Sequence, residues 1–193
     1  MQLTTTLNKI QQYSPCSDGW RKLLRYLGKT VAADEPLPFS VILDSNGLED
    51  ALWCCYTVPE YDWVWRLYAV WCARQVQRLI TDPRSLNALD VAERHANGQA
   101  TDGELSAAWA AAREAWVATK ADIEAPTEAG AQAVTWVARA PVNAGAAAWA
   151  AREAAFDEGA AEDTGDAQSA GDAARETARA AQAAKFREMV GGR

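Results

Sequence analysis

Histidine is the scarcest polar residue of this chain, since His95 is the single histidine among 193 residues. One histidine excludes the paired-histidine motif of zinc peptidases and the two-histidine triad of non-haem iron enzymes. General acid–base chemistry is left with one imidazole and no recognisable nucleophile beside it. Because His95 precedes Asn97-Gly98 at the predicted end of a helix, we interpret it as a C-terminal cap favoured by the helix dipole.

Glycine-rich phosphate loops are also missing. The twelve glycines are scattered, and neither GxGxxG nor GxxxxGK[ST] occurs. Adjacent carboxylates, such as Glu49-Asp50 and Glu162-Asp163, stand beside predicted turns or on polar faces, which favours solvated helix caps over metal ligands. We therefore expect no cofactor, no metal site, no catalytic residues and no enzymatic activity.

Long apolar runs are absent, because a charged residue interrupts each one well before the roughly 18 residues that a membrane span needs. The first residues lack the basic and apolar regions of a secretory signal. We expect a cytoplasmic protein that neither crosses nor binds a membrane.

Cysteine is sparse as well. Three of the four cysteines, Cys54, Cys55 and Cys72, fall in segments with the pattern of buried helices, while Cys16 does not. Cys54 and Cys55 point about 100° apart on a helix, which suits neither a disulfide nor a shared metal. The sequence predicts reduced core thiols.

Positive charge is in deficit, and the net charge of −7 is uneven. Residues 1–99 hold 11 acidic and 10 basic side chains, whereas residues 100–193 hold 15 and 9. The shortage of clustered bases argues against direct nucleic-acid binding. The acidity fits either attraction to a basic protein surface or the solubility of an exposed helical face. We predict an aromatic-rich helical core over 1–99 with an acidic Ala-rich half, 100–193, packed on it.

Helical periodicity dominates what is present. The patterns predict an all-α fold of stacked antiparallel helix pairs, either a bundle or a short α-solenoid, with seven to nine helices. Ser17 or Asp18 is the expected cap of an early helix, Asp82-Pro83 opens another, and Thr101 with Glu104 forms a capping box. Residues 39–43 are the one plausible strand.

The second half is rich in alanine and partly repetitive: AAWAAAREAW is followed by AAWAAREAAF, each with two large rings seven residues apart. Such rings share a helical face and can fill the gap between alanine stripes. The last helix, about 167–190, has an apolar face made mostly of alanine and would be marginal alone. It needs a partner, which is its own preceding helix, a second copy of the chain, or the target.

Tryptophan is abundant, with nine in the chain. Trp53, Trp63, Trp65 and Trp71 surround the apolar segment 61–80 and are predicted to be core residues, whereas Trp136 has no ring partner at helical spacing and is a candidate exposed anchor. The candidate partner-binding residues are Trp136, Glu153, Asp157, Glu158, Glu162, Asp163 and Asp166.

Two stretches carry a resemblance. WCARQVQRLITDPRSLNALDVAERHANGQATDGEL, at 71–105, and SPCSDGWRKLLRYLGK, at 14–29, resemble a group of uncharacterised Ala-rich helical proteins encoded by bacterial phages and prophages. The first stretch is also similar, more faintly, to helical immunity-protein domains. Neither group offers a catalytic motif to transfer.

The resemblance implies a gene of a mobile element. Small acidic phage proteins without catalytic residues include anti-CRISPR and other counter-defence inhibitors, so we expect a protein that blocks a host nucleic-acid-handling complex through an acidic helical surface. The alternative is an immunity-type or structural helical protein that binds a toxin or its own copy, and a homodimer is left open.

Overall fold

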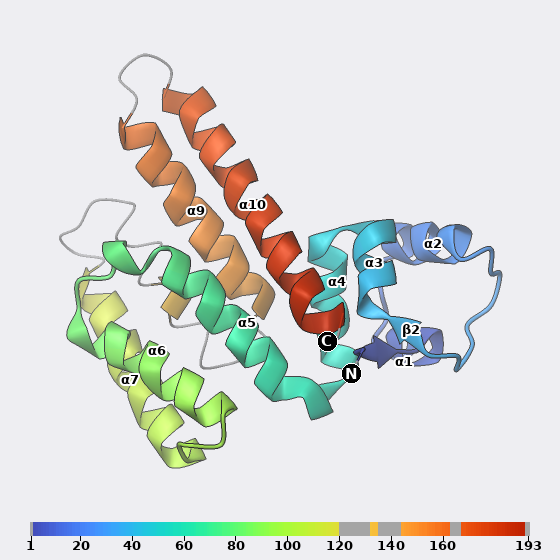
Figure 1. The fold of residues 1–193 in the computed structure, drawn as a ribbon, viewed down its shortest axis with the longest axis horizontal. Helices are drawn as coiled ribbons and strands as arrows, with labels where there is room; N and C mark the ends of the chain where they lie inside the picture. Colours follow the sequence, from blue (N-terminus) through green and yellow to red (C-terminus); the bar gives the residue numbers. More distant parts are fainter. Residues whose placement is uncertain (1, 120–131, 135–143, 163–166, 192–193) are drawn as a thin grey trace. The chain divides into compact units, whose positions relative to one another are not determined.

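A computed structural model describes residues 2–119, 132–134, 144–162 and 167–191. The chain forms two compact units (Figure 1). The first unit comprises residues 1–61 together with 183–193, and the second comprises residues 62–182. This division differs from the predicted boundary at residue 99, because the helices on either side of that boundary are close neighbours within the second unit.

The first unit is helical apart from one short ribbon. Strand β1, Thr4–Thr5, pairs antiparallel with β2, Leu37–Pro38, with Thr4 opposite Pro38. The backbone amide of Leu3 donates to the carbonyl of Val190 at 3.0 Å, so both ends of the chain belong to this unit. Its helices are α1, Leu7–Gln12; α2, Ser17–Tyr26; α3, Phe39–Asn46; α4, Leu48–Cys54; and the 3-10 turns Cys55–Thr57 and Pro59–Tyr61.

The second unit is built on helix α5, which contacts α6 and α9, while α6 also packs on α7. Short capped links, as predicted from the sequence, join α5 to α6 and α6 to α7. The helices are α5, Asp62–Gln75; the 3-10 turn Gln77–Leu79; α6, Pro83–Ala96; α7, Asp102–Thr119; α9, Ala144–Glu162; and α10, Ala167–Gly191, whose last turns belong to the first unit.

The all-α class is confirmed, since the described residues contain a single two-stranded ribbon among their helices. The described residues form ten helices, one more than the upper end of the seven to nine expected: nine labelled α-helices and a helical stretch at residues 132–134. The surplus comes from short helices, such as α1, that turn the chain between longer neighbours. Among the described residues, no helix is both long and apolar enough to cross a membrane.

The predicted strand at 39–43 is wrong, because these residues open helix α3. Phe39, Ile42 and Leu43 are buried at positions i, i+3 and i+4, which is the period of a helix and not of a strand. Pro38 holds Leu37 in an extended conformation, so the strand ends where the proline stands and the helix begins after it.

Helix α5 carries the core of the second unit. Trp65, Ala69 and Cys72 are buried in α5 and Val76 is buried just beyond its end; Trp65 and Cys72 were predicted to be core residues. Trp63 was also predicted to be a core residue, but its ring is 52% exposed. Trp63 and Trp65 lie about 200° apart on the helix, so the first turn buries one ring and leaves the other in solvent.

Helices α9 and α10 lie side by side and antiparallel within the second unit (Figure 1). A β-carbon placed on Gly171 would lie 2.6 Å from the ring of Phe156, and one on Gly159 would lie 2.8 Å from the β-carbon of Ala174. The helices therefore approach as closely as their glycines allow, and the aromatic ring fills the space. The last helix thus contacts its own preceding helix, which was one of the three partners expected for it.

Candidate functional site

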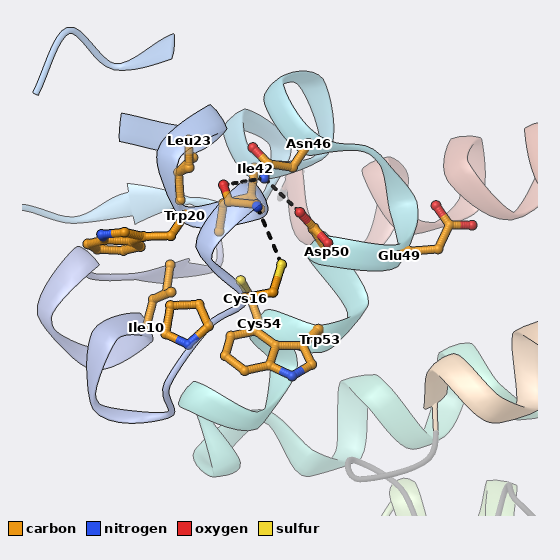
Figure 2. A pocket seen from close by; sticks show the side chains of 12 residues that line it. Ile10, Cys16, Trp20, Leu23, Ile42, Asn46, Glu49, Asp50, Trp53 and Cys54 are labelled. Atoms are coloured by element: carbon orange, nitrogen blue, oxygen red, sulfur yellow. Dashed lines mark hydrogen bonds between the residues drawn. The ribbon is translucent and has the colours of Figure 1, made fainter. Parts of the chain in front are cut away.

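A cavity of about 230 Å³ lies within the first unit, between the chain that enters α2 and helices α3 and α4 (Figure 2). Its walls are apolar: Ile10, Leu23 and Ile42 are almost fully buried side chains, and the half-buried rings of Trp20 and Trp53 also line it. The volume exceeds the roughly 150 Å³ of an engineered apolar cavity that accepts benzene. The cavity can therefore hold a group at least as large as an aromatic ring.

One edge of the cavity is polar and is organised around Gly19. The Asn46 Nδ2 donates to the Gly19 carbonyl at 2.8 Å and to Asp50 Oδ2 at 2.7 Å, and the Gly19 amide donates to Cys16 Sγ at 3.3 Å (Figure 2). A β-carbon on Gly19 would lie 2.7 Å from Asp50 Oδ2, so glycine lets the carboxylate approach the helix. The thiol of Cys16, and not Ser17 or Asp18 as predicted, caps α2.

The three cysteines predicted to be core thiols are buried and free, whereas Cys16 is free and exposed. Desolvation, with a smaller contribution from the charge of Asp50, raises the pKa of Cys54 to about 12. Burial also raises the pKa of Cys72 to about 12 and that of Cys55 well above its ordinary value. These three thiols are therefore protonated at neutral pH and unreactive, which leaves Cys16 as the accessible sulfur.

The structure places four of the predicted partner-binding residues on α9: Glu153, Asp157, Glu158 and Glu162. Glu153 pairs with Arg175 at 3.0 Å, and Glu158 accepts from Nε of Arg78 at 2.8 Å. Asp157 is half-buried and has no ion pair within the described residues. Trp136, Asp163, Asp166 and the side chain of Glu162 lie outside the described residues.

The charge of Asp157 can be tested through the pH dependence of stability. Burial above all, and then the like charge of Glu153, raises its pKa, while Arg175 lowers it. An acid whose folded-state pKa is raised destabilises the fold at pH values above that pKa. We expect Asp157→Asn to increase the free energy of unfolding by up to about 0.5 kcal/mol at pH 7, because solvent screens the site. Chemical denaturation from pH 7 to pH 3 should show the gain shrinking as the wild-type carboxyl becomes protonated, and a gain that persists at pH 3 would contradict this reason.

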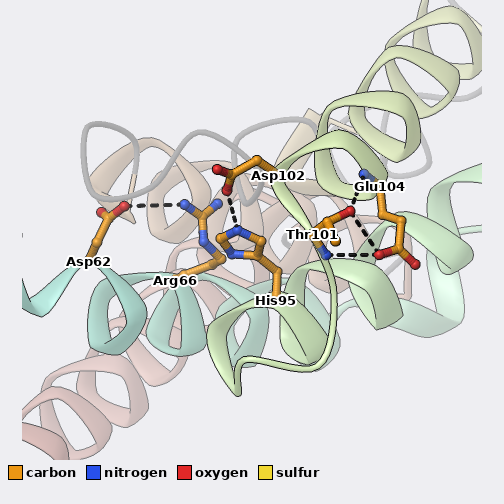
Figure 3. A network of polar contacts seen from close by, with 6 residues as sticks. All are labelled: Asp62, Arg66, His95, Thr101, Asp102 and Glu104. Carbon is orange, nitrogen blue, oxygen red and sulfur yellow. Dashed lines mark hydrogen bonds and ion pairs between the residues drawn. The ribbon is translucent and has the colours of Figure 1, made fainter.

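A polar network joins α5, α6 and α7 of the second unit (Figure 3). The Nε2 of His95 lies 2.7 Å from Asp102 Oδ1, across the turn between α6 and α7, so this histidine links two helices in addition to standing near the end of one. Arg66 is buried and lies 3.4 Å from Asp62; desolvation raises the pKa of Asp62 and lowers that of Arg66.

The capping box between Thr101 and Glu104 is confirmed. The Thr101 amide donates to Glu104 Oε2 at 2.8 Å, and the Glu104 amide donates to Thr101 Oγ1 at 3.2 Å.

The arginines of the apolar segment pair with acids: Arg66 contacts Asp62, Arg74 contacts Asp90 and Glu93, and Arg78 contacts Glu158. These pairs explain why charged residues sit beside a buried helix. In the described part of the chain, no three histidine, cysteine or acidic side chains are grouped to hold a metal ion.

The chain matches no protein-family model, no curated protein and no solved structure. The resemblances drawn from residues 14–29 and 71–105 therefore rest on the sequence alone. Sequence reasoning also missed the cavity of the first unit. The available signal was Gly19, because a glycine inside a predicted helix costs about 1 kcal/mol relative to alanine and marks a close approach.

Proposed function

We propose that the chain is a non-catalytic inhibitor that binds a basic protein surface through the acidic surface of its second unit, as a phage counter-defence protein of the anti-CRISPR kind would. The target in this proposal is a host complex that handles nucleic acid. Occupying its basic surface would exclude the phosphate backbone, which supplies much of the affinity for nucleic acid.

The observation that carries the proposal is the distribution of charge between the two units. The second unit contains 18 acidic and 11 basic residues, whereas the first contains eight of each, so the whole net charge of −7 belongs to the second unit. A unit that carries an excess of negative charge attracts a positively charged partner and speeds its association.

The internal ion pairs refine which acids can take part. Glu153 and Glu158 each neutralise an arginine of their own unit, and a partner would have to compete with those pairs. Asp157 has a raised pKa and no such pair within the described residues. The proposal is therefore tested with four acids of the predicted interface: Asp157, Glu162, Asp163 and Asp166.

The experiment is an affinity capture of the tagged chain from lysate of bacteria that carry defence systems, washed at low and high salt. We expect a nucleoprotein complex to be retained at low salt, released at high salt, and blocked from binding its nucleic acid at stoichiometric amounts of the chain. The test variant combines Asp157→Asn, Glu162→Gln, Asp163→Asn and Asp166→Asn and should lose the capture.

The matched control removes four charges from the first unit: Asp18→Asn, Asp34→Asn, Glu35→Gln and Glu60→Gln. Its net charge equals that of the test variant, so a loss of capture in both would indicate non-specific attraction and contradict the proposal. Recovery of a small toxin, or of the chain alone, with no salt dependence would favour the immunity-type or structural alternative.

A further inference from the structure

The cavity of the first unit has a chemistry that the proposed function does not use. Its walls are supplied by Ile10, Leu23, Ile42 and two tryptophans, and an apolar group that entered would be removed from water on several sides. Burial of apolar area is therefore the main source of affinity that the cavity offers. Tryptophan rings add a preference for cations, which are attracted to the face of an indole.

The charged residues that line the cavity are both acidic, Glu49 and Asp50. Figure 2 shows Glu49 directed away from the centre of the group and Asp50 beside Asn46 and Cys16. Asp50 is half-buried, accepts one hydrogen bond, from Asn46 to Oδ2, and has no ion pair with any residue that the structure describes. A partly desolvated carboxylate without a cation beside an apolar cavity favours a ligand that brings a positive charge.

We propose that this cavity binds a small amine, with an aromatic or branched alkyl group against the tryptophans and its ammonium group beside Asp50. An anion of the same size would face the carboxylate of Asp50. A neutral hydrocarbon would gain the apolar contacts but leave Asp50 without a partner. The cavity therefore selects by charge among ligands of equal shape.

Cys16 provides a local reporter of occupancy. It is the exposed cysteine of the chain, it lines the cavity, and the other three thiols are buried. The rate at which a maleimide alkylates the folded protein therefore reports on Cys16, and a ligand in the cavity should slow it. This readout is independent of any activity of the second unit.

The test compares three probes of similar shape: phenethylamine, 3-phenylpropionate and propylbenzene. Binding is followed by the indole N–H resonances of Trp20 and Trp53, assigned with Trp→Phe variants, and by the Cys16 alkylation rate. We expect phenethylamine to shift both resonances, to slow alkylation at least twofold at saturation, and to bind about fivefold or more tightly than either other probe, as a charge-assisted hydrogen bond allows. Asp50→Asn should abolish the preference, and Asp34→Asn, on the exposed surface of the same unit, should leave it unchanged.

The proposal is overturned if phenethylamine moves neither indole resonance, or if 3-phenylpropionate or propylbenzene binds as tightly as the amine. Asparagine can still accept the bond from Asn46, so the fold should tolerate Asp50→Asn; circular dichroism checks this. Should that variant fail to fold, two measurements on the native chain decide the question. They are the comparison of the three probes and the weakening of amine binding by salt, which an ion pair requires. Failure of the capture experiment on the second unit leaves this result unaffected.

Discussion

Phe186→Ala is expected to lower the free energy of unfolding of the first unit by about 3 to 5 kcal/mol, the usual cost of truncating a fully buried phenylalanine. Phe186 has no exposed surface, and its ring meets the ring of Phe39 edge to face at a centroid distance of 6.3 Å. The substitution removes the apolar contacts of one ring and the aromatic contact of both. It also leaves a cavity that helices cannot easily close.

Hydrogen exchange read by mass spectrometry measures this effect unit by unit. We expect amide exchange in α3, Phe39–Asn46, to accelerate strongly, with a smaller change in α6, Pro83–Ala96. Glu188→Ala is the control, because Glu188 lies on the same helix, is exposed, and among the described residues pairs at the surface with Lys185 alone. Equal exchange in the two variants would show that Phe186 does not hold the first unit together.

Gly171→Leu is expected to destabilise the second unit by about 1 to 3 kcal/mol or more, because it inserts a side chain where two helices already touch. A β-carbon at this position would lie 2.6 Å from ring carbons of Phe156 and 3.0 Å from the backbone oxygen of the same residue. The Phe156 ring is itself covered by the guanidinium of Arg175, 4.1 Å from its centroid, which limits its freedom to move. Leucine has a much higher helix propensity than glycine, so any loss must come from packing.

Thermal and chemical denaturation of Gly171→Leu should be compared with Gly103→Leu. Gly103 lies in the first turn of α7, and the nearest atom to an added β-carbon is Thr101 Oγ1 at 3.8 Å. The same substitution is therefore expected to be neutral or mildly stabilising at Gly103. If both variants are stabilised, the close approach of α9 and α10 is not a feature of the protein in solution.

Local signals predicted local structure well. Asp82 caps α6 with Pro83 at its first position, and Thr101 forms its box with Glu104, because each of these bonds spans at most three residues. The burial of Trp65 and Cys72 was predicted from the helical pattern of the segment that contains them. Such features depend on neighbours in the chain, which a sequence displays directly.

Features that depend on distant residues could not be predicted in this way. Glu158 pairs with Arg78, and Glu153 pairs with Arg175. Each pair joins two helices, and the local periodicity of a sequence does not predict which helices pack together. The helix at Phe39 was mistaken for a strand because a short apolar run fits both periods. To predict the cavity beside Asp50, one must know which residues face Gly19. To predict the exposure of Trp63, one must know which face of α5 is covered.

The division of α10 between the two units has a consequence for the synthesis of the chain. Phe186 and Val190 are buried parts of the first unit, and residues 62–182 must be translated before these residues exist. Residues 1–61 therefore lack part of their core while residues 62–182 are translated and form their local helix contacts. Assembly of the first unit is then a late event of high contact order. A chain released before α10 is complete would expose unfilled apolar surface to chaperones and proteases.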